Sequence, residues 1–399
     1  MNRRILALLL VFAMFAALMT GCASGKQETA ANGTAQTEQT ASEPADAAAE
    51  ETEAAEAPAA PAEETAAEAE TLVFTDSLGR EVELPKDIAR IAPSGAVATM
   101  ILAAIAPECM VTINATPTES QMAFLPANLA SLPETGQMYG SKANLNLETL
   151  LAADPQVVID LGDKKGEMTE DLNALQEQIG IPVIFIEADL AHMAEAFRTL
   201  GGLLEGKADR GQELADLVDR TTALAAESSA KITDDMRVRA MYTTGEDGLG
   251  TNAAGSIQAQ VLDMVGVENA VVVEDVSSKG GGNVISLEQL YNFDPDVILF
   301  ADGSIYDTVA DDSAWSQLTA ISSGRYYEIP GSPYSWLSGP PSMNMILGVW
   351  WLGNLIYPEI YDYDMAEMTQ ELYKTLWGYE LSSEEVTALL ENSTLKAAK

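Results

Sequence analysis

The chain has 399 residues, with 21 Lys and Arg against 61 Asp and Glu, so its formal net charge is −40 at pH 7. This charge argues against binding to nucleic acid and to anionic lipid surfaces. With a single histidine and two cysteines, few side chains are available to form a metal centre or to act as a catalytic base.

The first residues have the pattern of an export signal. Two arginines precede an apolar run from Ile5 to Met19, which is too short for a membrane-spanning helix but suits a secretory signal. The run ends in Met19-Thr20-Gly21-Cys22, which resembles the bacterial lipoprotein cleavage box. We therefore expect residues 1–22 to be a lipoprotein signal, with lipid attached at Cys22. The alternative is an ordinary signal peptide in which this cysteine is incidental.

Residues 23–70 are rich in Ala, Glu, Thr and Pro and contain almost no large apolar side chains. Such a stretch cannot bury enough surface to offset the entropy lost on ordering it. An Ala/Glu helix is possible in part, but Pro58 and Pro61 would interrupt it. We predict a disordered acidic tether with a span of roughly 40 Å. With Cys22 lipidated, Cys109 has no partner for an internal disulfide.

Residues 71–204 are predicted to form a first α/β lobe. Leu72 to Leu84 has the pattern of a β-hairpin, with a polar turn at Asp76–Gly79. Apolar strands and helices then alternate, which is typical of a parallel sheet covered by helices. Strands are expected at 88–92, 109–114, 157–161 and 182–186, and helices at 96–105, from about 145, at 168–179 and at 193–204.

A long connecting helix is predicted within residues 205–230. Apolar residues recur at helical spacing between Ala208 and about Ser229, and no Gly or Pro follows Gly211. The alternation restarts in residues 231–399, the predicted second lobe with a C-terminal helical extension. Strands are expected at 238–243, 297–301 and 326–329, and helices at 257–265, after Ser286, at 343–357 and at 365–390.

One motif occurs twice. Its first copy is Leu147-Glu148-x-Leu150-x-x-x-Asp154-Pro155-x-Val157-Val158-Ile159, and its second is Leu287-Glu288-x-Leu290-x-x-x-Asp294-Pro295-x-Val297-Ile298-Leu299. All matched positions are offset by 140 residues, which is about the size of a domain and too long for a solenoid repeat. The motif predicts two similar lobes, each with a glutamate at the start of a helix, and a ligand cleft between them.

These features resemble the substrate-binding proteins of ABC importers, in particular the helical-backbone class that takes up iron–siderophore, haem and corrinoid. The resemblance runs from about Leu72 to Tyr357. Three segments carry it: Asn144-Leu145-x-Leu147-Glu148, the run Ser256 to Asn269, and Ile285 to Leu290. It implies two Rossmann-like lobes joined by a stiff helix, a monomer without a resident cofactor, and a lipid-anchored position on the extracytoplasmic face of the cell membrane.

The resemblance also implies a partner. In this family the glutamate of each motif pairs with arginines of an ABC permease, which works with a cytoplasmic ATPase. Carried over, these residues are Glu148 and Glu288. Carboxylates held at helix starts are suitable acceptors for bidentate arginine, although each also favours its own helix dipole.

The ligand is expected at the carboxyl ends of the strands. The family places aromatic residues before the first motif and in the last loop, where Tyr139 and Trp336 occur. Lysines in these loops favour an anionic ligand, unless they are simply solvated. The predicted ligand-binding residues are Ser94, Tyr139, Gly140, Ser141, Lys142, Asn252, Lys279, Asn283, Tyr334 and Trp336.

The sequence therefore predicts a receptor for a small-molecule metal chelate, not an enzyme. His192, at a helix start, is assigned a surface or capping role, and no His, Cys and carboxylate set has metal-site spacing. Two alternatives remain open: a metal-chelate enzyme on the same bilobal scaffold, or a sensor or structural lipoprotein.

Overall fold

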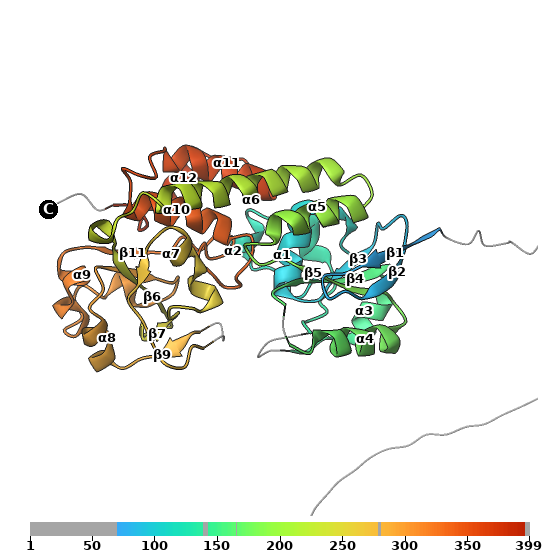
Figure 1. The fold of residues 1–399 in the computed structure, drawn as a ribbon, viewed down its shortest axis with the longest axis horizontal. Coiled ribbons are helices and arrows are strands. Elements are labelled where there is room, and N and C mark those ends of the chain that lie inside the picture. Colours follow the sequence, from blue (N-terminus) through green and yellow to red (C-terminus); the bar gives the residue numbers. More distant parts are fainter. Residues whose placement is uncertain (1–69, 139–142, 165, 278–280, 396–399) are drawn as a thin grey trace, which may run out of the picture. The chain divides into compact units, whose positions relative to one another are not determined.

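The computed structural model describes residues 70–138, 143–164, 166–277 and 281–395, which belong to one compact unit, Ala66–Lys399. Figure 1 shows two sheets, each with its own helices. The long helix α6 (Ala208–Ser229) follows the elements of the first sheet in sequence. The predicted mixed α/β class is confirmed.

The first lobe is built on a parallel sheet of order β3-β4-β5. A separate antiparallel hairpin precedes it, as predicted, and pairs Leu72 with Leu84. The alternating burial of β2 places Val82 and Leu84 in the core. The strands are β1 (Thr71–Thr75), β2 (Glu81–Pro85), β3 (Ile91–Pro93), β4 (Val157–Gly162) and β5 (Val183–Glu187).

Two single bridges extend this sheet beyond β3. Ile91 pairs with Met110, and Ile113 pairs with Glu134, both in parallel. The prediction of a regular strand at 109–114 is therefore wrong. The segment starts as a 3-10 turn, Pro107–Cys109, and then makes only one bridge on each side.

The second lobe has a mixed sheet in which β6, β10 and β11 are parallel. Strand β8 pairs with the start of β6, whereas β7 runs antiparallel to its end and pairs in turn with β9. The strands are β6 (Arg239–Thr244), β7 (Gly250–Thr251), β8 (Glu268–Asn269), β9 (Asn283–Val284), β10 (Val297–Phe300) and β11 (Tyr326–Glu328).

The helices agree closely with the predicted ranges. Those of the first lobe are α1 (Ala96–Ile105), α2 (Glu119–Met122), α3 (Leu147–Ala152), α4 (Met168–Ile179) and α5 (Met193–Leu203). Those of the second lobe are α7 (Gln260–Met264), α8 (Leu287–Phe293), α9 (Thr319–Ser322) and α10 (Met345–Ile356). The helix expected from Ile257 begins as a 3-10 turn, Ile257–Ala259.

Helix α6 matches the predicted connecting helix and is amphipathic. Leu214, Leu217 and Val218 lie in a large apolar core that contains residues of both lobes. Trp350 of α10 donates a hydrogen bond through Nε1 to Thr221 Oγ1 at 2.9 Å, which fixes α10 against α6. Because one core runs through both lobes and α6, their relative movement would disturb packed side chains.

The C-terminal extension forms two helices, α11 (Met365–Trp377) and α12 (Ser383–Leu390), instead of the single stretch predicted at 365–390. Gly378 ends α11 in the left-handed conformation, with φ of 68°. Ser382 starts α12 with a capping box. This arrangement turns the chain back on itself, so that α12 packs on α11.

Helix α11 contacts both lobes. The ring of Tyr373 lies edge-on to Phe124 of the first lobe at 5.5 Å and at a tilted angle to Trp336 of the second at 6.4 Å. Its hydroxyl donates to the carbonyl of Ser332 in the second lobe. The extension is therefore part of the interlobe packing.

Arg210 of α6 connects the ends of two other helices. Its guanidinium donates to Ala104 O of α1 at 2.9 and 3.0 Å and to Thr375 O of α11 at 2.6 Å. A third carbonyl, Leu376 O, lies at 3.3 Å. Carbonyls in the last turn of a helix have no hydrogen-bond partner within that helix. Here the Arg210 guanidinium binds such carbonyls at the ends of both α1 and α11, where the helix dipole favours a positive charge.

We predict that Arg210→Met lowers the free energy of unfolding by about 3 kcal/mol, because it leaves these half-buried carbonyls without their charged donor. Urea denaturation followed by tryptophan fluorescence measures the change. Arg198→Met is the matched control, since the ion pairs of Arg198 are exposed and worth less than about 1 kcal/mol. Equal losses in the two variants would contradict this role.

Candidate functional site

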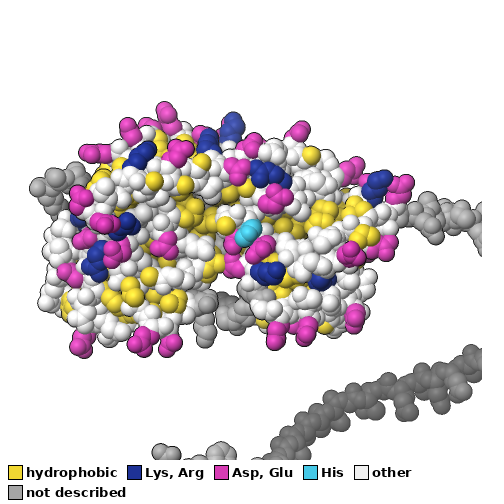
Figure 2. All heavy atoms as spheres, viewed as in Figure 1, with side chains coloured by type: hydrophobic (Ala, Val, Ile, Leu, Met, Phe, Trp, Pro, Cys, Tyr) yellow, Lys and Arg dark blue, Asp and Glu magenta, His cyan; other side chains and the backbone are white. Residues whose placement is uncertain are grey.

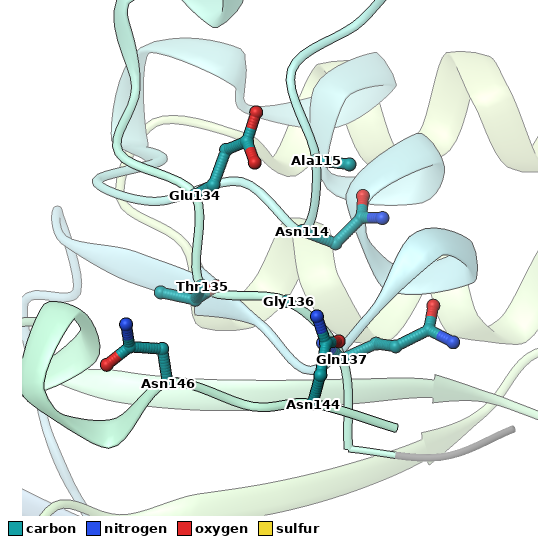
Figure 3. A pocket seen from close by; sticks show the side chains of 8 residues that line it. All are labelled: Asn114, Ala115, Glu134, Thr135, Gly136, Gln137, Asn144 and Asn146. Atoms are coloured by element: carbon teal, nitrogen blue, oxygen red, sulfur yellow. The ribbon is translucent and has the colours of Figure 1, made fainter. Parts of the chain in front are cut away.

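A polar pocket opens at the carboxyl edge of the first-lobe sheet. Ile113 and Glu134 pair in parallel, so the residues that follow them lie at the edge where ligands bind in open α/β sheets. The pocket has a volume of about 490 Å³, within the range of small-molecule sites. It is lined by Asn114, Ala115, Glu134, Thr135, Gly136, Gln137, Asn144 and Asn146 (Figure 3).

Backbone pairing holds the walls of the pocket in place. Asn146 N donates to Thr135 O at 2.7 Å, and Asn144 N donates to Gln137 O at 3.0 Å. The Asn144 side-chain oxygen accepts from Gln137 N at 3.2 Å. Gly136 has φ of +74°, and a Cβ there would lie 2.6 Å from Asn144 O, so both conformation and space require glycine.

The side chains that line the pocket are mostly hydrogen-bonding groups. Four of its side chains are amides, and Figure 3 shows those of Asn114, Gln137 and Asn144 close to Gly136. Hydrogen bonds from Thr116 lower the pKa of Glu134, so this carboxylate is ionised at neutral pH. No Lys or Arg is among the described residues that line the pocket. The site therefore suits a hydrophilic ligand with donors and acceptors.

The predicted ligand residue Ser94 lies beside this pocket but is engaged within the protein. It is buried at the end of β3, and its hydroxyl donates to the Asp160 carboxylate. Its carbonyl accepts from Met138 N at 2.9 Å, which connects β3 to the pocket wall. Ser94 therefore lies at the same edge of the sheet as the pocket.

The second lobe brings Asn252 and Asn283 together. Asn283 faces Thr251 in the β7–β9 ladder, and its amide bonds Asp275 O and Ser277 N, so it fixes a loop. Asn252 is only 1% exposed, yet among the described residues neither its side-chain nitrogen nor its oxygen has a hydrogen-bond partner. A buried amide in this state costs free energy unless water or a ligand satisfies it.

Trp336 does not line a cleft, contrary to the prediction. It is fully buried, donates through Nε1 to Ser332 O at 3.3 Å, and lies edge-on to Trp351 at 6.5 Å. The physical reason is that α10 and Tyr373 of α11 cover this loop, which a local sequence pattern does not reveal. Neighbouring Tyr334 is also largely enclosed, and burial raises its pKa to about 12.

Several predicted residues lie outside the described residues. They are Tyr139, Gly140, Ser141, Lys142, Lys279 and the lipidation residue Cys22. Of the other loop lysines, Lys164 is exposed and donates to Ser77 O at 3.4 Å.

Glu148 and Glu288 occupy equivalent places in the two lobes, as the motif predicted. Each is exposed in the first turn of its helix, α3 or α8. The Asn146 side chain caps α3, and Ser286 caps α8 through a capping box. One buried leucine anchors each helix, Leu150 in α3 and Leu290 in α8.

His192 forms a polar group that the sequence reading missed. Its Nδ1 lies 2.7 Å from Asp189 Oδ1, and Glu187, Asp189 and His192 place three possible metal ligands within 4.8 Å. Figure 2 shows the single histidine beside acidic side chains. The signal was the spacing Glu187-x-Asp189-x-x-His192 directly after a buried strand. Asp189 also accepts His192 N at 2.9 Å, so the group serves the start of α5.

The two lobes, one with a parallel and one with a mixed sheet, the long helix that follows the first and the polar pocket at a carboxyl edge have the architecture of a two-lobed binding protein. The family described as periplasmic binding protein matches residues 99–333, more than half of the chain, so the chain belongs to this family. This family consists of extracytoplasmic substrate-binding proteins of transporters, not of enzymes. No curated protein sequence matches the chain significantly.

Solved structures of the same fold cover most of the chain. An ABC transporter solute-binding protein from Sulfurospirillum deleyianum is 27% identical, with a TM-score of 0.73 over 80% of this chain and 99% of that one. A periplasmic solute-binding protein from Veillonella parvula is 22% identical, with a TM-score of 0.68 over 81% and 98%. The molybdate-binding protein MolA from Haemophilus influenzae is 21% identical, with a TM-score of 0.63 over 78% and 99%.

No helix within the described ranges is long and apolar enough to cross a membrane.

We predict that His192 titrates above its usual pKa of 6.5, because its hydrogen bond to Asp189 favours the charged ring. The stability that this pair contributes is fully present below the unfolded pKa and is lost as the pH rises through the folded pKa. Since the chain has one histidine, its ring-proton NMR signal is unique and gives the midpoint directly. Asp189→Asn is expected to return the midpoint towards 6.5; an unchanged midpoint would contradict the assignment.

Proposed function

We propose that the chain is a lipid-anchored substrate-binding protein of an ABC importer, which captures a metal chelate outside the cytoplasm and delivers it to the permease. The observation that carries the proposal is the equivalent placement of Glu148 and Glu288. Both are exposed and lie in the first turn of capped helices, one in each lobe. A permease built from two similar halves would need such a pseudo-symmetric pair.

The docking step follows from the chemistry of the two carboxylates. Exposed carboxylates at fixed positions accept bidentate hydrogen bonds from arginine, which are directional and charge-assisted. Ion pairs at an accessible surface determine register and encounter rate more than total affinity. This suits a receptor that must dock and dissociate in each transport cycle.

The ligand that we propose is an iron–siderophore, haem or corrinoid-type chelate, and the pocket favours the hydrophilic members of this set. Its described lining is dominated by amides, which bind carboxylate, hydroxamate or hydroxyl groups through paired donors and acceptors. A flat macrocycle would instead need aromatic faces. Of the two aromatic side chains predicted for that purpose, Trp336 is buried in the core and Tyr139 lies outside the described residues.

The anchor that we propose is lipid on Cys22, followed by the acidic tether of residues 23–70. Acyl chains hold a protein at a membrane by burying methylene groups, at about 0.8 kcal/mol each. A tether with a span of roughly 40 Å would let the receptor reach a permease in the same membrane. Repulsion among its carboxylates would lengthen that span.

The double variant Glu148→Ala/Glu288→Ala is expected to bind ligand normally and to abolish uptake, because the pocket is intact while both permease contacts are lost. Uptake of the radiolabelled chelate by cells that carry the variant, together with calorimetric affinity of the purified protein, measures the two effects.

The matched control is Glu170→Ala/Glu367→Ala, which removes two other exposed first-turn glutamates. Uptake is expected to be normal in this control. Normal uptake by the Glu148/Glu288 variant would remove the case for docking.

Gln137→Ala is expected to weaken ligand affinity about fivefold to tenfold, the equivalent of one net hydrogen bond. The backbone of Gln137, and not its side chain, makes the bonds that shape the wall, so the pocket should persist. Isothermal titration with ferric catecholate, hydroxamate and citrate chelates, haem and cobalamin measures the affinities. Gln212→Ala, on the exposed face of α6, is the control. Equal affinities in the two variants would show that the ligand binds outside this pocket.

A further inference from the structure

An arginine from the neighbouring strand region caps the C-terminal end of α3. Arg90 Nε donates to Asp154 O at 2.8 Å, and its Nη2 donates to Ala153 O. The backbone of Arg90 is itself held, because its carbonyl accepts from Gln156 N at 2.9 Å and its N–H donates to Gln156 Oε1 at 3.0 Å. The guanidinium thus closes the end of the helix that begins beside Glu148.

The second lobe repeats this arrangement at α8. Arg239 donates through Nη1 to Asp294 O at 3.1 Å and through Nη2 to Phe293 O at 2.8 Å. Its carbonyl accepts from Asp296 N at 2.8 Å, and its N–H donates to Asp296 Oδ2 at 2.9 Å. The two carbonyls, and the residue Asp296 that binds the arginine backbone, lie 140 positions after their first-lobe counterparts Ala153, Asp154 and Gln156.

The aspartates at these helix ends have an unusual backbone conformation. Asp154 has φ of 50° and Asp294 has φ of 36°, and they are the two non-glycine residues with positive φ in the described part of the chain. A left-handed residue after a helix turns the last carbonyls outward. The arginine binds those carbonyls, so the turn and the guanidinium form one unit in each lobe.

The sequence motif hides this equivalence. Arg90 and Arg239 are 149 positions apart, so they do not align with the gap-free repeat of 140, and only the fold shows that they correspond. Helices of six and seven residues are too short to be stable alone. Their direction therefore depends on the buried leucine, the N-terminal cap and the arginine at the other end.

We propose that Arg90 and Arg239 are positioning residues for docking, which fix the directions of α3 and α8 and thereby the separation of Glu148 and Glu288. This inference rests on the proposed docking function. Two carboxylates can bind two fixed arginine sites on the permease only if the two carboxylates and the two arginine sites are equally far apart. A helix that rotates about its buried leucine changes this distance, so its glutamate loses the contact with its arginine. Neither arginine lines the described ligand pocket, so docking should be affected more than ligand binding.

The test is the double variant Arg90→Met/Arg239→Met in the full chain, purified in detergent and added to its permease–ATPase complex in nanodiscs. We expect the concentration that half-maximally stimulates ATP hydrolysis to rise about tenfold, the cost of one lost charge-assisted contact. The maximal rate should be unchanged, because a fully docked complex remains possible. Arg90→Lys/Arg239→Lys should restore part of the affinity, since one ammonium still reaches a carbonyl.

The control is Arg198→Met/Arg237→Met, which removes one exposed arginine from each lobe and the same total charge. Thermal unfolding, measured in parallel, ensures that all variants are folded at the assay temperature. Half-maximal stimulation within twofold of the parent chain would overturn the positioning role, provided that Glu148→Ala/Glu288→Ala abolishes stimulation. If the glutamate variant stimulates normally, the docking proposal fails as well.

Discussion

The hydrogen bonds of Arg210 to the carbonyls that end α1 and α11 constrain how the whole receptor can move. The donor is on the connecting helix, one acceptor is in the first lobe, and the other acceptors are in the C-terminal extension. Tyr373 of the same extension contacts Phe124 and Trp336, one in each lobe. The lobes are therefore joined by α6 in sequence, and by both α6 and α11 in space.

A receptor of this kind separates two tasks that have different physical requirements. In the proposed function, ligand recognition would use loops at the carboxyl edge of a sheet, where amide side chains can be exchanged without loss of the fold. Docking would need two carboxylates at a constant separation, which suits capped helices attached to the two sheets. The shared core keeps that separation constant, because a close-packed interior resists small displacements.

The acidic surface is consistent with this separation of ligand recognition from docking. Figure 2 shows acidic side chains distributed over the face in view, with fewer basic ones among them. The field of so many carboxylates would attract basic groups of a partner and repel other copies of the chain. An arginine-bearing permease surface would be favoured over most others, while the directional bonds at the two motif helices would select the register.

Elements with a strong apolar period could be predicted from the sequence. The bounds of α4 and α6 and the β1–β2 hairpin agree with the predictions, because each buries an unbroken face or is bounded by turn residues. The repeated motif placed both glutamates correctly, since capping and burial are local properties. The prediction for Trp336 was wrong because distant helices cover that loop.

The polar features of the site were less accessible to sequence reasoning. Gln137 and Asn114 line the pocket only because two isolated bridges align their segments. Arg90 and Arg239 have equivalent roles at different offsets, which no gap-free comparison detects. In each case the function of a side chain depends on contacts between residues far apart in the sequence, and hydrogen bonds of this kind leave no periodic signal.

The most direct test of the account is site-specific photo-crosslinking in intact cells, with benzoylphenylalanine introduced in turn at positions 148, 288 and 170. The account predicts that positions 148 and 288 crosslink to the permease and that position 170, also in the first turn of an exposed helix, does not. Absence of permease crosslinks from both 148 and 288, in protein that still binds its ligand, would contradict it.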